Sequence, residues 1–134
     1  MLLQIDHHSG QPIYRQVMEQ IRRQILAGHL GEGEQLASVR ELAGQLNVNP
    51  MTISKAYSLL EIEGLLERRR GVGLFVARIR RDQKSRSKGE MLEQVLARAV
   101  ATAVQLDIPE SEVHESIERL FERYGSTMRR QEHE

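Results

Sequence analysis

The sequence contains no cysteine and no tryptophan, and it has only two phenylalanines, three tyrosines and three prolines. The absence of cysteine excludes a disulfide framework and a thiol nucleophile, and it fits a reducing compartment. No apolar run approaches the ~20 residues that span a bilayer. The first ten residues also lack the basic start and long apolar stretch of a signal peptide. We therefore expect a small cytoplasmic protein with no membrane partner.

The motifs of common enzymes are missing too. There is no Gly-rich loop followed by Lys-Ser/Thr, and no His/Glu metal pattern on a predicted helix. His7 and His8 are adjacent, but no Cys or His partner stands nearby at metal-ligand spacing. His114 lies among Glu110, Glu115 and Glu118. We interpret the first pair as loop residues and His114 as part of a charged helix surface. The sequence therefore predicts no catalytic residue, no metal and no cofactor.

The formal net charge is zero, which by itself argues against a nucleic-acid partner, but the charge is unevenly distributed. Residues 1–81 contain 11 basic and 8 acidic side chains, whereas residues 82–134 contain 8 and 11. Between positions 68 and 88 there are nine basic residues and one acid. Screening limits electrostatic reach to about 8–10 Å at ordinary salt, so a local block matters more than the total. The block is compatible with phosphate binding; the alternative is a solvated, charged linker.

The centre of the chain predicts two short helices joined by a tight turn. Ser38 followed by Glu41 is a capping-box pattern, and apolar residues then recur at helical spacing as far as Leu46. Asn49 is a good N-cap, and the proline after it suits a first helical position. The second helix is expected to end at Gly64.

Two β-prone runs follow, Leu65–Glu67 and Leu74–Val76, joined by the loop RRRGVG. An earlier helix is predicted from Pro12 to Ala27, with apolar residues along one side and Gly28 after it. Helix, turn, helix and a basic hairpin together are the layout of a winged helix-turn-helix. The fold class expected is therefore mainly α with a small β wing.

The outer face of the second helix decides whether this layout suits DNA. If Ile53 points into the core, then Met51, Lys55 and Ser58 point roughly away from it. This face has no acid before Glu61, so it could enter a major groove without repelling phosphates. The alternative is a solvated helix, since helix-turn-helix geometry also occurs in modules that bind proteins.

Residues 12–76 resemble the DNA-binding domain of GntR-family transcription repressors. The similar segments, in order, are PIYRQVMEQIRRQILAG, SVRELA, NPMTISKAYSLLEIEGLLE and RRGVGLFV. The short remainder resembles the small-tailed branch of that family, often called YtrA-like. The resemblance implies a transcription regulator that represses by occupying a promoter.

Candidate DNA contacts follow from the residues and from the resemblance. Arg40 lies in a first helical turn, where free N–H groups and the dipole favour an anion, and the matching arginine of GntR relatives touches DNA. Gly71 and Gly73 allow a tight turn and close backbone approach, and Arg70 at the tip suits a narrow minor groove. The predicted DNA-binding residues are Ser38, Arg40, Asn49, Thr52, Ser54, Lys55, Arg69, Arg70, Gly71 and Gly73.

Within this set, Arg40, Thr52 and Lys55 are expected to read base edges, whereas Ser38 and an arginine of the first helix (Arg15 or Arg22) would contact phosphates. The chain also departs from the family pattern. Relatives often have an arginine in place of Pro50, so the base preference of this helix is expected to differ. They usually also have prolines where this chain has Gly31 and Ala37, so the connector between the first two helices should be looser.

The C-terminal part shows two helical patterns broken at Ile108-Pro109, after a polar stretch, Asp82–Gly89, that we interpret as a spacer. A two-helix hairpin is too small to be stable alone, so it either packs back on residues 1–77 or pairs with a second copy. We expect a homodimer, as the resemblance also implies. The predicted interface residues are Leu92, Val95, Leu96, Ala99, Val100, Ile117, Leu120, Phe121 and Tyr124.

These inferences divide the chain into a DNA-binding domain (1–78), a basic linker (79–89) and a helical dimerisation hairpin (90–130). Such a homodimer would bind an inverted repeat in double-stranded DNA, because the operator mirrors the two-fold symmetry of the protein. No residue pattern indicates a small-molecule effector. The competing hypothesis is a winged-helix module that binds proteins, for which zero net charge is the main argument.

Overall fold

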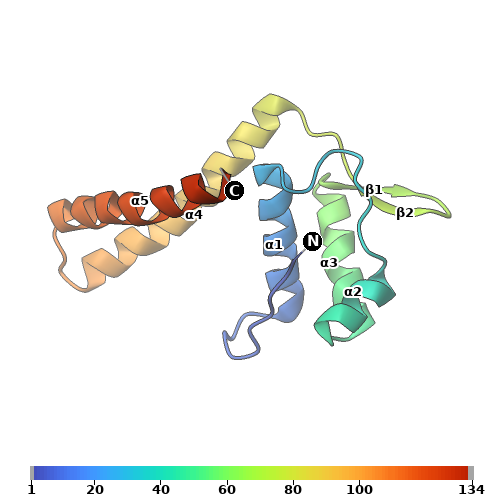
Figure 1. Cartoon of the computed structure of the whole chain (residues 1–134). Helices are drawn as coiled ribbons and strands as arrows, with labels where there is room; N and C mark the ends of the chain where they lie inside the picture. The colour runs from blue at the N-terminus through green and yellow to red at the C-terminus, as the bar shows by residue number, and fades with distance from the viewer. Residues whose placement is uncertain (1, 133–134) are drawn as a thin grey trace. The chain divides into compact units, whose positions relative to one another are not determined.

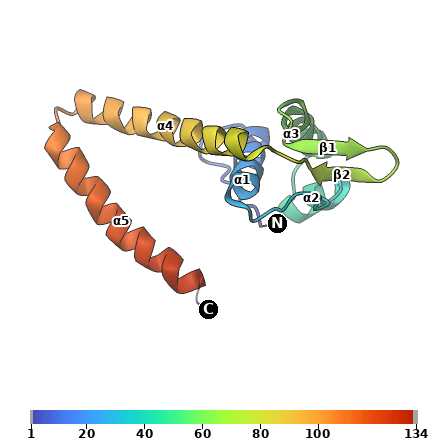
Figure 2. The same cartoon turned by 90° about the horizontal axis from the view of Figure 1, so that it is seen from above.

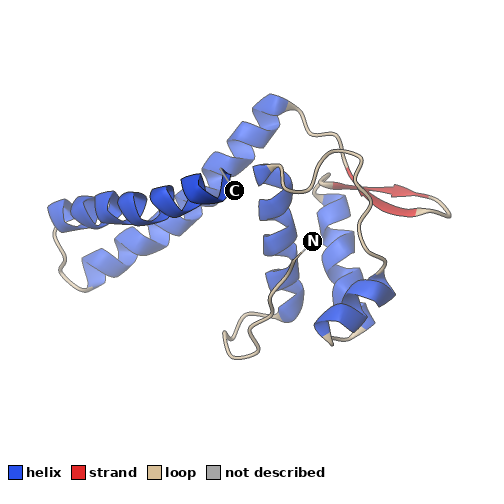
Figure 3. Cartoon of the chain, viewed as in Figure 1, coloured by secondary structure: helices blue, strands red, loops and turns tan. Residues whose placement is uncertain are grey.

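The computed structural model of the protein describes residues 2–132, with side chains described for residues 2–125. Within that range the elements, in chain order, are α1 (Ile13–Ala27), α2 (Val39–Leu46), α3 (Pro50–Ile62), β1 (Leu66–Arg69), β2 (Gly73–Val76), α4 (Arg81–Gln105) and α5 (Glu110–Glu132) (Figure 1, Figure 3). The chain divides into two compact units that meet between Lys88 and Gly89. The predicted fold, mainly helical with a small β wing and a C-terminal helical region, is confirmed.

Local capping interactions fix the starts of α2 and α3 as the sequence predicts. The Ser38 hydroxyl accepts a hydrogen bond from the Glu41 N–H at 3.1 Å, and the Asn49 side-chain oxygen accepts one from the Met51 N–H at 2.9 Å. Each cap satisfies a backbone donor that has no partner inside its helix. At the other end of α1, Gly28 closes the helix with a left-handed backbone, φ 84°.

The core of the first unit lies where α1 packs beside α3 (Figure 1). Val17 and Ile21 of α1 and Ile53 and Leu60 of α3 are completely buried. These residues stand at i, i+4 or i, i+7 spacing, which places each pair on one side of its helix. The rigid contact between the two helices is therefore what sets the orientation of α3.

The wing is an antiparallel pair in which Arg69 of β1 lies opposite Gly73 of β2. The strand β1 begins one residue later than predicted and extends to Arg69. The connector before α2 also pairs with β2: the Gly33 N–H donates to the Val76 carbonyl and the Leu36 N–H to the Leu74 carbonyl, both at 2.9 Å. The connector lacks the prolines of relatives, but backbone hydrogen bonds that the sequence did not predict hold it against the wing.

An extended N-terminal arm lies along α1 and is held there by glutamine side chains. The side-chain amide of Gln20 accepts from the Gln4 N–H at 2.9 Å and donates to the Gln4 carbonyl at 2.7 Å. Gln16, one helical turn earlier, does the same with the backbone of Asp6, at 2.9 Å in both directions. Gln16 and Gln20 stand at i, i+4 spacing on α1 and so match Asp6 and Gln4, which are alternate residues of the arm. The backbone N–H and carbonyl groups of these two arm residues are therefore hydrogen-bonded without belonging to a sheet.

The residues that we interpret as a spacer, 82–89, are helical, because α4 already begins at Arg81. Lysine, arginine, glutamine and glutamate all favour helices, and one glycine costs too little to stop the helix. Asp82 stands in the first turn, where a carboxylate is favoured, and Arg80 binds it at 2.7 Å. The hydrogen bond from Arg80 holds the pKa of the Asp82 carboxyl below its usual range. The division of the chain into a DNA-binding domain (1–78), a linker (79–89) and a dimerisation hairpin (90–130) stays a prediction.

The second unit consists of the rest of α4 and of α5, joined by a short turn. Asp107 in the turn has φ 56°, and the Ile108 N–H donates to the Ala103 carbonyl at 2.8 Å. The two helices diverge from this turn (Figure 2) and do not pack against each other along their lengths. Ala103 is the one buried side chain of α4. Most apolar side chains of this unit are therefore exposed within a single copy of the chain.

Candidate nucleic-acid interface

The outer face of α3 is open to solvent, as its spacing predicts. Ile53 is completely buried, whereas Met51 on the opposite side of the helix is 77% exposed. Ser54 and Lys55 are exposed as well, and Thr52 is half-buried at the flank. A slim, polar helix face of this kind fits the dimensions of a DNA major groove.

Both acids near the end of α3 are paired with arginines from other elements. Glu61 binds Arg68 of β1 at 3.3 Å, and Glu63 binds Arg22 of α1 at 2.6 Å. The negative charge beside the outer face is therefore locally balanced. Arg22 is engaged with a carboxylate, which leaves Arg15 as the candidate phosphate contact on α1.

The start of α2 carries Ser38 and Arg40, and a buried tyrosine of α3 fixes its approach. The Tyr57 hydroxyl donates to the Ala37 carbonyl at 2.8 Å, one residue before the N-cap. Burial, with a smaller contribution from the Glu41 carboxylate, raises the pKa of Tyr57 well above its usual range. The hydroxyl therefore stays protonated, as its role of hydrogen-bond donor requires.

Arg40 is exposed and makes no ion pair or side-chain hydrogen bond with any of residues 2–125, whose side chains the structure describes. The alternative to a DNA contact at this position is a salt bridge to Glu41 or Glu34, and neither is present among these residues. Glu34 instead accepts a hydrogen bond from the Gly31 N–H at 2.9 Å. The guanidinium of Arg40 thus remains available to an external anion or to a guanine edge.

The wing presents two arginines in different environments. The Arg69 guanidinium lies over the Phe75 ring, 4.0 Å from its centroid, whereas Arg70 is exposed at the turn. Gly71 has φ 76° and Gly73 has φ 145°, conformations that side chains rarely adopt. A Cβ on Gly73 would also lie 3.0 Å from the Gln35 amide nitrogen, which donates to the Val72 carbonyl. Gly73 therefore has a structural role in the wing, whether or not it also touches DNA.

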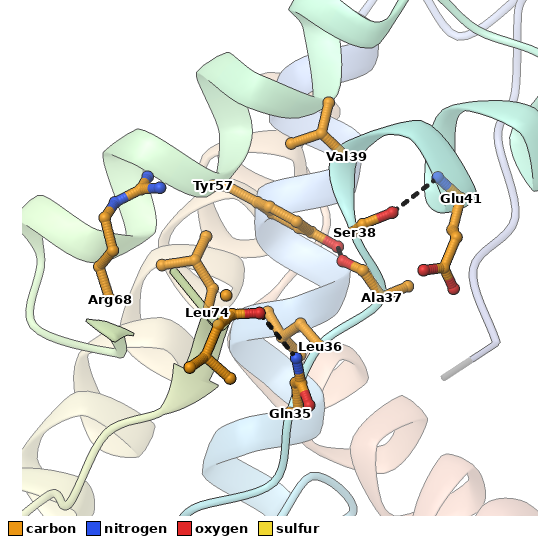
Figure 4. A pocket seen from close by; sticks show the side chains of 11 residues that line it. Gln35, Leu36, Ala37, Ser38, Val39, Glu41, Tyr57, Arg68 and Leu74 are labelled. Atoms are coloured by element: carbon orange, nitrogen blue, oxygen red, sulfur yellow. Dashed lines mark hydrogen bonds between the residues drawn. The ribbon is translucent and has the colours of Figure 1, made fainter. Parts of the chain in front are cut away.

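A cleft of about 550 Å³ lies between the wing and the start of α2 (Figure 4). Ser38, Tyr57, Gly73 and Leu74 are among the residues that line it. The cleft brings two of the predicted DNA-contacting elements close together, although they are far apart in sequence. Arg68, which also lines it, was not among the predicted site residues.

The predicted contacts on α3 lie in its first turns, but two of them already have partners. The side-chain oxygen of Asn49 accepts the capping hydrogen bond, which leaves the N–H groups of its side-chain amide free to donate. The Lys55 ammonium lies over the Tyr14 ring of α1, 4.0 Å from the centroid. Sequence reasoning missed Tyr14 and Phe75 as residues of the site, because no local pattern indicates which ring a cation will meet.

No helix within residues 2–132 combines the length and apolar character required to cross a bilayer. Among residues 2–125, whose side chains are described, no three His, Asp or Glu side chains are grouped closely enough to hold a metal ion.

Comparison with known proteins connects this geometry to a family. The model described as bacterial regulatory proteins, gntR family, matches residues 13–76, from the start of α1 to the end of β2. The HTH-type transcriptional repressor YtrA of Bacillus subtilis (strain 168) is 34% identical over 119 residues, which cover 89% of this chain and 92% of that protein. This similarity extends into the C-terminal unit.

Two solved structures are similar over most of their length. A GntR family transcriptional regulator from Listeria monocytogenes has a TM-score of 0.75 at 28% identity, covering 86% of this chain and 98% of that one. YtrA from Sulfolobus acidocaldarius, a GntR-family transcription factor, has a TM-score of 0.59 at 35% identity, covering 75% and 99%. The similarity thus includes both the winged unit and helices beyond it.

Proposed function

Because the chain belongs to the GntR family of bacterial regulatory proteins and is a DNA-binding transcription regulator, we propose that it acts as a homodimeric repressor of an inverted-repeat operator. The observation that carries the proposal is the outer face of α3, which is polar and slim and has its neighbouring acids neutralised. In this proposal the protein works in the cytoplasm and needs no cofactor.

In the proposed complex α3 enters the major groove and the wing tip enters the adjoining minor groove. Arg40 and Thr52 read base edges, and each good bidentate contact discriminates by about 1–3 kcal/mol. Asn49 and Ser54 add hydrogen bonds from the first turns of α3. Arg70 and the bare backbone at Gly71 suit a narrow minor groove, where arginine is favoured.

Phosphate contacts would position the protein on the duplex. Ser38 and Arg15 supply them near α3, and the first turns of α4 add a basic segment, Arg81–Lys88, with the charges in a regular helical array. Arg69 would contact the backbone beside the wing. Because each neutralised phosphate releases counterions, affinity should fall steeply with salt.

The open arrangement of α4 and α5 supports the dimer. Leu92 is 59% exposed and Phe121 74% exposed in a single copy, although both belong to apolar helix stripes. Exposed apolar stripes of this kind are typical of surfaces that bury themselves against a partner. A second copy related by two-fold symmetry offers the same stripes in return, and the predicted interface residues from Leu92 to Tyr124 would then be covered.

Selection of bound sequences from random duplex DNA tests the proposal. The expected result is an enriched site with two inverted half-sites, bound by a dimer in sedimentation measurements. The Arg40→Ala variant should bind that site about 5- to 150-fold more weakly and select a more degenerate sequence, because it loses one base contact. A direct or unpaired site would contradict the symmetric dimer. Failure to bind any DNA at low salt would favour the protein-binding module instead.

A further inference from the structure

We propose that Tyr14 is a positioning residue for DNA binding: its ring holds the Lys55 ammonium at the edge of α3, where it contacts a phosphate instead of a base. The inference rests on the proposed function, since it assumes that α3 enters the major groove. It assigns Tyr14 a role that the sequence did not indicate, and it changes the role expected of Lys55.

The contact joins two elements of the core. Tyr14 stands in the first turn of α1 and is half-buried, packed against the hydrophobic core, so its ring has a fixed position. The Lys55 Nζ lies 4.0 Å from the ring centroid, within the range of a cation–π interaction. The lysine is otherwise exposed and makes no ion pair with any side chain described in the structure, residues 2–125. The ring is therefore the feature that orients its ammonium.

The position of Lys55 around the helix favours a phosphate partner. Glu61 of α3 meets Arg68 of the wing on one flank of the helix, while Lys55 meets α1 on another. A helix with its side chains is about 10–12 Å across, and the major groove is about 12 Å wide. A side chain directed sideways from a helix in the groove therefore meets the groove wall, which is the sugar–phosphate backbone.

The chemistry of the contact fits this role. A ring covers one side of an ammonium and leaves its remaining N–H groups exposed to solvent, so the cation can bind a phosphate oxygen without leaving the ring. A lysine held in advance also loses less side-chain freedom on binding than a freely moving one. A second cation–π contact of this kind occurs in the wing, where the Arg69 guanidinium lies 4.0 Å from the Phe75 ring centroid.

The test uses the full-length protein with its selected site and a random duplex, titrated at several salt concentrations. Lys55→Ala should weaken binding to both duplexes by a similar factor and lower the salt slope by about 0.9. Tyr14→Leu, which keeps an apolar side chain but removes the ring, should weaken both about two- to fivefold. Tyr14→Phe is the matched control, because it keeps the ring, and it should bind like wild type.

A double-mutant cycle then isolates the coupling. Adding Tyr14→Leu to Lys55→Ala should cause no further loss, since the ring acts through the lysine. In the free protein, the methylene protons next to Nζ of Lys55 should show an upfield ring-current shift by NMR, which Tyr14→Leu abolishes and Tyr14→Phe keeps. Circular dichroism establishes that each variant is folded.

Several outcomes would overturn the inference. Equal losses from Tyr14→Leu with and without Lys55 would show that the tyrosine acts independently. A loss from Tyr14→Phe as large as that from Tyr14→Leu would assign the effect to the hydroxyl. If Lys55→Ala weakens binding to the selected site but not to the random duplex, the lysine contacts a base. If Lys55→Ala changes binding to neither duplex, the lysine is not part of the interface. Absence of binding by the wild-type protein would instead refute the proposed function.

Discussion

At the scale of single residues, the aromatic side chains of the first unit all serve polar or charged partners. Tyr57 donates to the Ala37 carbonyl, Tyr14 lies under Lys55, and Phe75 lies under Arg69. The chain has only 4% aromatic residues, and each of these three rings is buried or half-buried and lies beside a polar or charged group near the candidate DNA interface. The tyrosine hydroxyl of residue 57 is the case that stability measurements can test most directly.

Replacing Tyr57 by phenylalanine should lower the free energy of unfolding by about 1–2 kcal/mol, because the Ala37 carbonyl loses its donor in a partly buried place. Urea unfolding would measure the change. Tyr14→Phe is a matched control and should change the free energy by less than about 0.5 kcal/mol. Equal losses in the two variants would show that the hydrogen bond at Ala37 is not the cause.

The same hydroxyl makes stability depend on pH. The folded state raises the pKa of Tyr57, whereas an unfolded tyrosine has a pKa of about 10. The contribution of this group is therefore fully present below pH ~10 and is lost as the pH rises further, since only the unfolded chain then releases the proton. The difference in the free energy of unfolding between wild type and Tyr57→Phe, measured by urea unfolding between pH 8 and 11, should show that decline. A constant difference would contradict the assignment.

At the scale of elements, the wing combines a tight glycine-containing turn with an exposed cation. Glycines at positive φ form the turn and the connector to α2 pairs with β2, so the tip is carried on a short but well hydrogen-bonded base. This construction presents the Arg70 guanidinium away from the core without requiring it to stabilise the fold. A contact of this kind adds affinity that depends little on the major-groove sequence.

Replacing Arg70 by alanine should therefore weaken binding to all duplexes and reduce the salt slope by about 0.9, while unfolding stays unchanged. Gel-shift titrations at several salt concentrations would measure both quantities. Arg23→Ala, which removes an exposed arginine beside the N-terminal arm, serves as a control for net charge. If the two variants lose the same affinity, the wing makes no specific contact with DNA.

At the scale of the whole molecule, the second unit leaves its apolar stripes uncovered. Leu96 is 37% exposed and Phe121 74% exposed, and α4 and α5 diverge instead of covering each other (Figure 2). Two helices of this kind bury too little surface to be stable as a separate unit. The proposed two-fold dimer would bury these apolar stripes, and it would also carry two DNA-binding winged domains.

A charge at either position should split the dimer, because it would have to be buried without a partner. Sedimentation should show Leu96→Glu and Phe121→Glu as monomers at concentrations where wild type is dimeric, with affinity for the selected site reduced at least tenfold. Gln94→Glu introduces the same charge on the opposite side of α4 and should leave the dimer intact. An unaltered oligomer in the first two variants would refute the interface.

Features that depend on near neighbours in the chain can be predicted from the sequence. The caps at Ser38 and Asn49, the end of α1 at Gly28 and the exposed face of α3 all follow from residues within one or two turns of each other, where spacing and propensity decide the backbone. The helical conformation of residues 82–89 also has a local cause. Their polarity is typical of a spacer, whereas their helix-favouring side chains continue α4 through them.

Which distant groups contact one another depends on the packing of the folded chain. Arg22 pairs with Glu63, 41 residues away, and Tyr14 meets Lys55 because α1 packs beside α3. Nothing in local spacing specifies such partners, since they depend on how complete helices pack and on which side chain each surface then presents to the other. The candidate DNA-reading residues are thus predictable from the sequence, whereas the packing of α1, α3 and the wing determines which of them are free, paired or held in place.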